Sequence, residues 1–248
     1  MPEGDTIWRT AAGLRAGVGG RMVTAARPDR LGALAGRTLE SVEPVGKHLL
    51  MRFSGGLTLH SHMRMNGSWH LYRTGERWRR PERQARAVLE FGDRVAVCFA
   101  APTLELVRDG REAVRHLGPD LLAEGVRLDE VVARARAIGP VAVGELLLDQ
   151  RVCCGIGNVY RCETLWQRRC DPWRSSAALA DAELAELFAF ARDALRENLG
   201  GSERRFGGRP AAVHGRRGRP CPRCGAPVRA RGQGEHARLT YWCPSCQV

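Results

Sequence analysis

The spacing of apolar residues divides the chain into a first part that is strand-like and a second part that is helical. Across residues 5–17 apolar side chains recur every three or four positions, which predicts a helix that Asp5 or Thr6 can cap. From 21 to about 107 the pattern changes to short β-branched runs separated by glycine or proline. We therefore expect one helix followed by a sandwich or barrel of antiparallel strands.

Residues that favour turns separate the predicted strands and mark the end of the strand-like part. Residues 54–56 (Ser-Gly-Gly) and 92–93 (Gly-Asp) have the composition of hairpin turns. The segment 73–84 is polar and predicts a longer loop. At 116–120 (His-Leu-Gly-Pro-Asp) the strand-like pattern stops, so a boundary between two parts of the fold is expected there.

Beyond residue 120 the apolar spacing predicts helices. The helical stretches are 128–137, 141–149, 156–168 and 179–198. The last has Asp181 near its start and two glycines, 200–201, after its end, as helix boundaries favour. Residues 200–220 are rich in glycine and arginine, so we predict a mobile, basic linker there.

The charge of the chain narrows the class of partner. A net charge of +12 and a pI of about 10.1 favour a polyanion over a neutral metabolite. Residues 201–248 alone hold ten arginines against two glutamates, and Lys47 is the single lysine of the chain. No apolar run approaches the roughly 20 residues of a membrane span, and no signal peptide is apparent. We therefore expect a cytosolic protein with reduced thiols.

The nine cysteines fall into two groups. Four follow the pattern Cys221-x2-Cys224-x18-Cys243-x2-Cys246, the spacing of a four-cysteine zinc site. One structural Zn2+ is expected, because four thiolates leave no position for a reactive water, with a thiol cluster or redox pair as the alternative. The other five lack ligand spacing and are predicted to be buried thiols: Cys98, Cys153, Cys154, Cys162 and Cys170.

The first residues of the chain contain groups that could carry out covalent catalysis. If the initiator methionine is removed, Pro2 carries a free secondary amine, and an α-amino group titrates near ~8 rather than the ~10.4 of lysine. Attack of such an amine on a sugar aldehyde-type carbon yields an iminium ion, an electron sink for elimination. Glu3 and Asp5 would supply carboxylates for proton transfer. The alternative is an ordinary translation start with a frayed end.

Three separated motifs together carry a family resemblance. PEGDT opens the chain, LLLDQRVCCGIGNVYRCETLW occupies 146–166, and a four-cysteine finger with HARLTYWCPSCQ ends it. This arrangement resembles the formamidopyrimidine-DNA glycosylase/endonuclease VIII family of base-excision repair enzymes nearly from end to end. The resemblance implies an N-terminal β-sandwich, a helix–two-turn–helix domain and a zinc finger, with DNA held between the lobes.

The resemblance also assigns roles to single residues. Pro2 would be the Schiff-base nucleophile at C1′ of the damaged nucleotide, and Glu3 would handle the protons of base release and ring opening. Lys47 matches a lysine near the lesion phosphate that assists β-elimination; without the family it would be a charge at a strand end. Asn158 matches an asparagine that binds a backbone phosphate, and Arg238 matches the finger arginine that grips the same phosphate and assists δ-elimination.

A flipped nucleotide leaves a hole in the duplex that something must fill. The segment 62–67, His-Met-Arg-Met-Asn-Gly, lies in the slot that the family uses for this purpose. Met65 would be an apolar wedge, and Arg64 would reach base edges or phosphates. For Met63 and Met65 alike, packing in the strand core is an equal alternative.

The absence of one tripeptide indicates which branch of the family the chain resembles. Purine-specific members carry an Arg–Phe–Gly loop after a mid-domain strand, and the corresponding stretch here, CFAAPTLELVRDG, has none. With PEGD at the start, this resembles the endonuclease VIII branch, which removes oxidised pyrimidines such as thymine glycol. A purine-specific formamidopyrimidine/8-oxoguanine glycosylase is the alternative within the family.

The expectation is thus an α+β multidomain protein. Residues 1–118 would form an N-terminal antiparallel β-sandwich catalytic domain with flanking helices, 119–205 the helix–two-turn–helix DNA-binding domain, and 206–248 the linker and zinc finger. It would act as a bifunctional DNA glycosylase and AP lyase, through β,δ-elimination. We expect a monomer in the bacterial cytosol or nucleoid, with damaged double-stranded DNA as partner and no membrane. A non-catalytic DNA-binding protein remains the alternative, and it would have no need of Pro2, Glu3 or Lys47.

Overall fold

The computed structural model describes residues 2–201 and 203–248, and the chain divides into two compact units, Met1–His116 and Leu117–Val248. Each unit has its own hydrophobic core. The predicted removal of Met1 concerns a residue outside the described part. In the part of the chain described, no helix combines the length and the apolar character that a membrane span requires.

Unit 1 is a sandwich of two four-stranded sheets, and every pairing in it is antiparallel. One sheet has the order β1-β6-β7-β5 and the other β2-β3-β4-β8. The strands are β1 (Ala25–Arg27), β2 (Leu39–Val45), β3 (His48–Phe53), β4 (Leu57–His62), β5 (Ser68–Arg73), β6 (Ala85–Glu90), β7 (Arg94–Phe99) and β8 (Thr103–Val107). The predicted turns at 54–56 and 92–93 connect β3 to β4 and β6 to β7.

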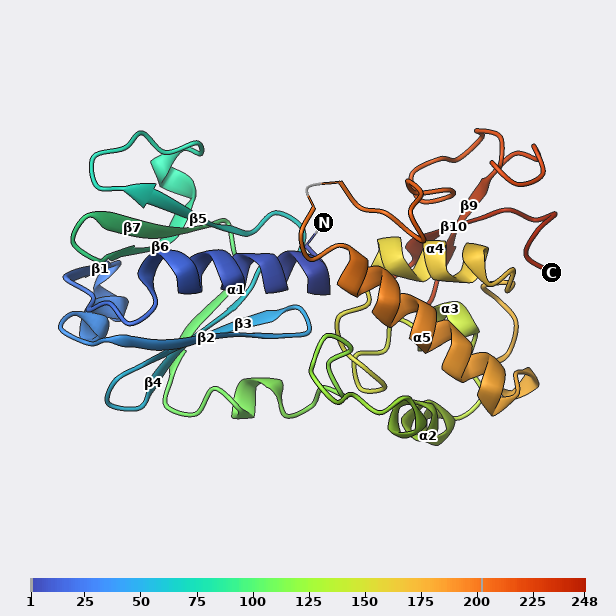
Figure 1. The fold of residues 1–248 in the computed structure, drawn as a ribbon, viewed down its shortest axis with the longest axis horizontal. Coiled ribbons are helices and arrows are strands. Elements are labelled where there is room, and N and C mark those ends of the chain that lie inside the picture. Colours follow the sequence, from blue (N-terminus) through green and yellow to red (C-terminus); the bar gives the residue numbers. More distant parts are fainter. Residues whose placement is uncertain (1, 202) are drawn as a thin grey trace. The chain divides into compact units, whose positions relative to one another are not determined.

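Helix α1 (Gly4–Val18) contributes to the sandwich core and runs between the strands of the two sheets (Figure 1). It begins earlier than predicted, because the Glu3 carbonyl accepts the amides of Thr6 and Ile7 at 2.9 and 3.1 Å. Glu3 therefore occupies the N-cap position, and its side chain makes no capping hydrogen bond. The prediction that Asp5 or Thr6 caps this helix was wrong.

Alternation along β3 and β4 separates the sandwich core from a second, polar face. Leu49 and Met51 of β3 and Leu59 of β4 point into the core and are fully buried. His48 and His60 occupy the alternate positions and so lie on the outer face. There Gly110 approaches Thr58 so closely that a Cβ would lie 2.6 Å from its methyl carbon.

Unit 2 is helical and ends in a two-stranded hairpin. Its elements are α2 (Leu128–Ile138), α3 (Val143–Leu146), α4 (Asn158–Gln167), α5 (Asp181–Glu197), β9 (Arg229–Gln233) and β10 (Arg238–Trp242). The helix predicted over 141–149 shrinks to the single turn of α3, since Asp149 accepts the amide of Arg151 at 2.9 Å and turns the chain. The helix predicted over 156–168 starts at Asn158 because Gly157 is extended.

The segment predicted as a mobile linker packs into unit 2. Phe206 and Val213 are fully buried. The buried carboxylate of Glu163 on α4 accepts the backbone amides of Ala212, Val213 and His214 at 2.7 to 3.0 Å. These hydrogen bonds fix residues 212–214 against α4, so this stretch does not behave as the glycine-rich composition suggested.

Candidate functional site

The start of the chain is built into the fold. Pro2 is half-buried, and Glu3 and Asp5 are fully buried. Asp5 pairs with Arg9 one helical turn later, Oδ2 to Nη2 at 3.3 Å. The Glu3 carboxylate lies at the N-terminus of α1, where the helix dipole favours negative charge. A secondary amine beside a sheltered carboxylate is a suitable arrangement for covalent catalysis with proton transfer, and its burial argues against a frayed end.

Lys47 lies in the turn between β2 and β3, half-buried beside Gly46. Gly46 has a φ of 57°, in the region that a glycine adopts without strain. The charge of Lys47 contributes to lowering the pKa values of His48 and His62, so its ammonium group lies near both rings.

Four histidines cluster next to Lys47 on the outer face of the sheet. The Nδ1 atom of His48 and the Nε2 atom of His60 are 2.8 Å apart, and the ring of His48 also contacts His62 and His116 at centroid distances of 4.6 and 6.0 Å. Burial, then the positive charges of the other rings and Lys47, lowers the pKa of His48 to about 3. Burial also lowers the pKa values of His60 and His62, so these two side chains and His48 favour the neutral form at physiological pH.

Sequence reasoning missed this cluster, although its signal was present. His48, His60 and His62 occupy positions of strands that alternation puts on one face. The cluster does not form a metal site: within residues 2–201 and 203–248, only the four finger cysteines bring three or more ligand atoms close together.

The two methionines of the predicted wedge segment differ in burial. Met63 is 1% exposed and belongs to the sandwich core, whereas Met65 is 60% exposed. Arg64 between them has a φ of 44°, which turns the chain outward and leaves Arg64, Met65 and Asn66 at the surface. Of the two alternatives left open, core packing therefore holds for Met63 and not for Met65.

In unit 2, Asn158 begins α4 and is tied to the hairpin. Its Nδ2 donates to the carbonyl of Leu239 at 2.9 Å, and its Oδ1 accepts a hydrogen bond from Arg161. Arg161 is fully buried and reaches Gln233 Oε1 of β9 at 3.5 Å. Gly155, just before the helix, has a φ of 110°, a conformation that glycine alone adopts readily. Sequence reasoning missed Arg161, since an arginine in a helix is ordinarily a surface residue and no pattern around it indicates burial.

Arg238 is exposed at the first position of β10, opposite Gln233. Leu239 beside it is 48% exposed. The other two arginines of the hairpin, Arg229 and Arg231, lie nearer the opposite end, and the guanidinium of Arg231 stacks 4.0 Å above the ring of Trp173. Among the three, Arg238 is thus the one beside the turn and closest in the chain to the Asn158 contact.

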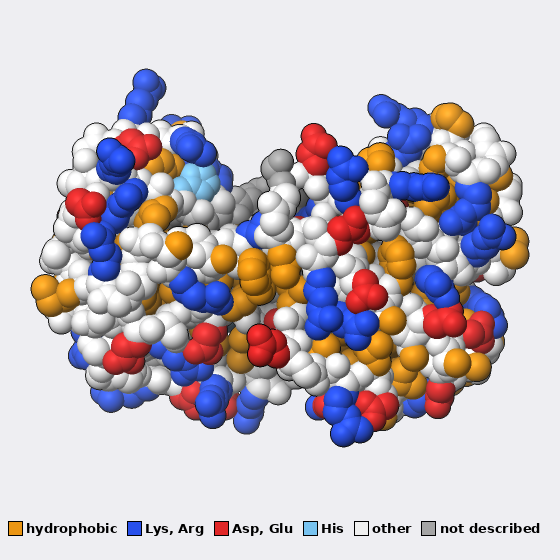
Figure 2. Space-filling view, viewed as in Figure 1, with side chains coloured by type: hydrophobic (Ala, Val, Ile, Leu, Met, Phe, Trp, Pro, Cys, Tyr) orange, Lys and Arg blue, Asp and Glu red, His pale blue; other side chains and the backbone are white. Residues whose placement is uncertain are grey.

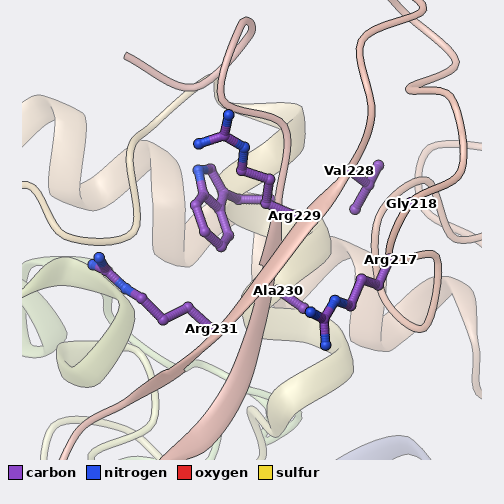
Figure 3. Close-up of a pocket in the computed structure, with 7 residues that line it drawn as sticks. Arg217, Gly218, Val228, Arg229, Ala230 and Arg231 are labelled. Carbon is purple, nitrogen blue, oxygen red and sulfur yellow. The ribbon is translucent and has the colours of Figure 1, made fainter.

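The base of the hairpin carries a basic groove of about 430 Å³. All the charged residues that line it are arginines: Arg217, Arg229 and Arg231. Figure 3 shows Arg229 and Arg231 projecting from β9, with Arg217 approaching Ala230 from the neighbouring segment. Arginines also lie across the drawn face of each unit in Figure 2, interspersed with acidic side chains. The groove suits an anionic ligand.

The four finger cysteines fit a tetrahedral zinc ion. Their sulfur atoms all lie within 4.8 Å of one another, with Cys221 to Cys246 at 3.9 Å and Cys224 to Cys243 at 3.5 Å. A Zn–S bond of about 2.3 Å places sulfurs about 3.8 Å apart. Burial raises the pKa of Cys221, but backbone amides and the indole N–H of Trp166 outweigh it and lower that pKa to about 6, toward the thiolate. The other five cysteines are buried, as predicted.

Comparisons with known families cover most of the chain. Residues 1–103 match the formamidopyrimidine-DNA glycosylase N-terminal domain, 117–206 the H2TH domain of the same enzymes, and 218–248 the zinc finger found in FPG and IleRS. A probable endonuclease 8 2 of Streptomyces coelicolor is 43% identical over 260 residues, covering 100% of this chain and 94% of its own. The DNA-(apurinic or apyrimidinic site) lyase Nei2 of Mycolicibacterium smegmatis is 37% identical, covering 100% and 99%.

Solved structures agree with the fold. The MutM (Fpg) protein of Thermus thermophilus superimposes with a TM-score of 0.82 at 31% identity, covering 99% of this chain and 98% of its own. An Fpg of Lactococcus lactis, bound to DNA with an abasic site, has a TM-score of 0.83 at 22% identity over 99% of both chains, which shows the shared fold. The chain therefore belongs to the formamidopyrimidine-DNA glycosylase/endonuclease VIII family, in its endonuclease VIII branch, and is a DNA glycosylase and AP lyase of base-excision repair with one structural zinc ion.

Proposed function

We propose that this enzyme excises oxidised pyrimidines from damaged double-stranded DNA, with Pro2 as nucleophile, and then cleaves the strand by β,δ-elimination. The observation that carries the proposal is the sheltered start of the chain, where Pro2 directly precedes the buried carboxylate of Glu3. It would act as a monomer on the DNA of the bacterial cytosol and nucleoid. The parts are 1–118 for catalysis, 119–205 for the helical DNA-binding domain, and 206–248 for linker and finger.

The chemical steps follow from the iminium ion. The Pro2 nitrogen would give up its proton and bond to C1′ as the bond from C1′ to the damaged base breaks and the base leaves with a proton. The C1′–O4′ bond then breaks, the nitrogen lone pair completes the C=N bond of the iminium, and O4′ takes a proton. Glu3 would handle the protons of both base release and ring opening. The iminium then withdraws electrons, so that loss of a C2′ proton expels the 3′ phosphate and loss of a C4′ proton expels the 5′ phosphate. Water finally hydrolyses the iminium and returns Pro2 as a free amine. Lys47 would lie near the lesion phosphate, where its positive charge offsets the negative charge of the leaving phosphate.

Two residues of unit 2 would hold the DNA backbone. Asn158 and Arg238 are brought close by the hydrogen bond from Asn158 to the Leu239 carbonyl. A side-chain amide N–H and a guanidinium both suit a phosphate, and neither contact with the backbone reads the base sequence. The zinc ion would stabilise the hairpin that presents Arg238 and takes no part in the chemistry.

The wedge and the lesion preference complete the proposal. Met65 is the exposed apolar residue that would enter the gap left by the flipped nucleotide, and Arg64 would contact base edges or phosphates. Preference for pyrimidines is supported by the connection from β7 to β8, which is only residues 100–102 and offers no room for a longer loop with further wedge residues.

Borohydride trapping on abasic duplex DNA tests the nucleophile. A covalent complex with the wild type and none with Pro2→Gly supports the proposal. Strand cleavage by the wild type without any trapped complex would instead show that the reaction does not pass through a Schiff base with Pro2. Comparing cleavage of thymine glycol and 8-oxoguanine duplexes tests the lesion class: faster cleavage of the 8-oxoguanine duplex would assign the purine specificity.

A further inference from the structure

The candidate wedge, here called the wedge loop, consists of Arg64, Met65 and Asn66. The chain closes at its base, where the Gly67 amide donates to the Met63 carbonyl at 2.8 Å. A Cβ on Gly67 would lie 2.6 Å from that same oxygen, so the closure requires glycine. Because Met63 is part of the core, one end of the wedge loop is fixed by packing.

The other end is fixed by an arginine from a different loop. Arg80, in the connection between β5 and β6, donates from Nη1 to the Asn66 carbonyl at 2.8 Å and to Ser68 Oγ at 3.0 Å. Its Nε donates to Gln84 Oε1 at 3.1 Å. One planar guanidinium therefore joins the last residue of the wedge loop, the start of β5 and the short helical turn before β6.

Arg80 is itself held in place by aromatic side chains. Its guanidinium carbon lies 5.6 Å from the centre of the Phe99 ring. Trp78, two residues earlier, packs edge-on against Phe99 at 5.8 Å and stacks on Tyr72 at 6.2 Å. The Tyr72 hydroxyl in turn accepts the amide of Arg79 at 3.1 Å. The loop that carries Arg80 is thus anchored on the sheet.

A wedge needs such support because insertion into DNA pushes against it. Unstacking of the neighbouring base pairs costs free energy, so a wedge loop that can change conformation on contact with DNA separates them poorly. The wedge loop also contains Arg64 in the left-handed region, which a residue with a side chain adopts only when its surroundings impose it. A hydrogen bond from a charged donor to the Asn66 carbonyl adds to the constraint from two others, from the Arg64 amide to His62 Nδ1 and from the Gly67 amide to the Met63 carbonyl.

We propose that Arg80 is a positioning residue, which holds the wedge loop in its inserting conformation and so governs extrusion of the damaged nucleotide from duplex DNA. This inference rests on the proposed role of Met65 as the wedge. Arg80 would have no part in the reaction at C1′. Loss of Arg80 should therefore slow reactions that need a nucleotide to be extruded, and spare those on a site that is already unstacked.

Arg80→Gln tests the proposal with Arg77→Gln as its matched control. Both variants lose one positive charge from the same loop, and Arg77 is exposed. Extrusion is followed in single-turnover experiments by the fluorescence of 2-aminopurine next to a lesion in a duplex. Borohydride trapping on an abasic site inside an unpaired bubble follows the chemistry alone. Melting temperatures confirm that both variants are folded.

Arg80→Gln is expected to slow extrusion about tenfold relative to Arg77→Gln, equivalent to about 1.4 kcal/mol, close to the lower end of the range for a hydrogen bond from a charged group. Trapping in the bubble should agree within about twofold between the two variants. Arg80→Lys keeps the charge but cannot span Asn66, Ser68 and Gln84, so it should resemble Arg80→Gln. Equal extrusion rates in Arg80→Gln and Arg77→Gln overturn the inference, as does an equal loss in duplex and bubble.

Met65→Ala separates this inference from the function on which it rests. Slow extrusion in Met65→Ala together with normal extrusion in Arg80→Gln removes the role of Arg80 and leaves the wedge intact. Normal extrusion in Met65→Ala removes the wedge assignment itself.

Discussion

The side-chain amide of Asn158 donates to the backbone carbonyl of Leu239 across 2.9 Å. The start of α4 and the second strand of the finger hairpin are joined at this point. The two candidate phosphate ligands, Asn158 and Arg238, are thereby held as one unit although they are far apart in the sequence. Replacing either should weaken the same phosphate contact.

Arg238→Ala should lower affinity for duplex DNA of any sequence and reduce the steepness of its salt dependence. Removing one phosphate contact lowers the slope of log K against log salt by about 0.9. Fluorescence anisotropy between 50 and 200 mM salt measures that slope. Arg134→Ala is the control, because its guanidinium is exposed on α2 and pairs with Glu130 at 3.0 Å. A loss confined to particular sequences would argue for base readout by Arg238.

Removal of zinc should abolish DNA cleavage while unit 1 stays folded. The finger has a small cluster of buried residues around Cys221 and Cys243, whereas unit 1 has a separate, large core. Elemental analysis should find one zinc per chain in the wild type and in Cys98→Ala, and less in Cys221→Ser. Normal nicking by zinc-free Cys221→Ser would show that the finger is dispensable.

Glu163→Gln should destabilise unit 2 by about 1–3 kcal/mol, because the amide group cannot accept three backbone N–H donors and its own NH2 is left opposed to one of them. Chemical denaturation measures the free energy of unfolding. Glu197→Gln is a matched control, since that exposed carboxylate also accepts backbone amides, from Gly207 and Gly208 at 2.9 and 2.8 Å. An equal loss in both variants would mean that the burial of Glu163 adds nothing.

Unit 1 should lose stability as the pH falls below about 6.5. Burial lowers the pKa of His48 to about 3 and that of His62 to about 4, while the unfolded chain binds protons there near ~6.5. At pH values between the folded and the unfolded pKa, the unfolded state binds more protons than the folded state. The free energy of unfolding therefore falls by about 1.4 kcal/mol per pH unit for each extra proton that the unfolded state binds.

His48→Gln should make that pH dependence shallower by about one proton, as measured by urea denaturation between pH 7 and pH 4. The groups that face His48 are His60, His62, His116 and Lys47, all retained in the variant. His236→Gln, an exposed residue of the finger, is the control. An unchanged slope in His48→Gln would show that His48 is protonated in the folded state.

Much of the fold was predictable because local signals and tertiary structure agree. The glycine turns at 54–56 and 92–93, the short antiparallel strands on either side of them, and the helix after Asp181 all form as expected. The segment around Val213 was not predictable, because its order comes from a carboxylate, Glu163, 50 residues earlier. Glycine and arginine composition reports local freedom and contains no information about such a distant acceptor.

The functional site likewise contains residues that were predictable from the sequence and residues that were not. The spacing of Cys221, Cys224, Cys243 and Cys246 defines their cluster, because a tetrahedral metal imposes that spacing. Which methionine is exposed depends on the backbone angle of Arg64, which no periodicity encodes. The buried guanidinium of Arg161 depends on acceptors from three separate segments, at Asn158, Gly144 and Gln233.

The separation of Met63 from Met65 has a consequence for how this enzyme can diversify. The fold depends on the first side chain and on the glycine that follows the tip, while the three residues between them contribute no packing to the core. If the tip meets DNA as proposed, substitutions there can alter which lesions are accepted without a penalty in thermal tolerance. These three positions can then vary in sequence while the architecture stays the same.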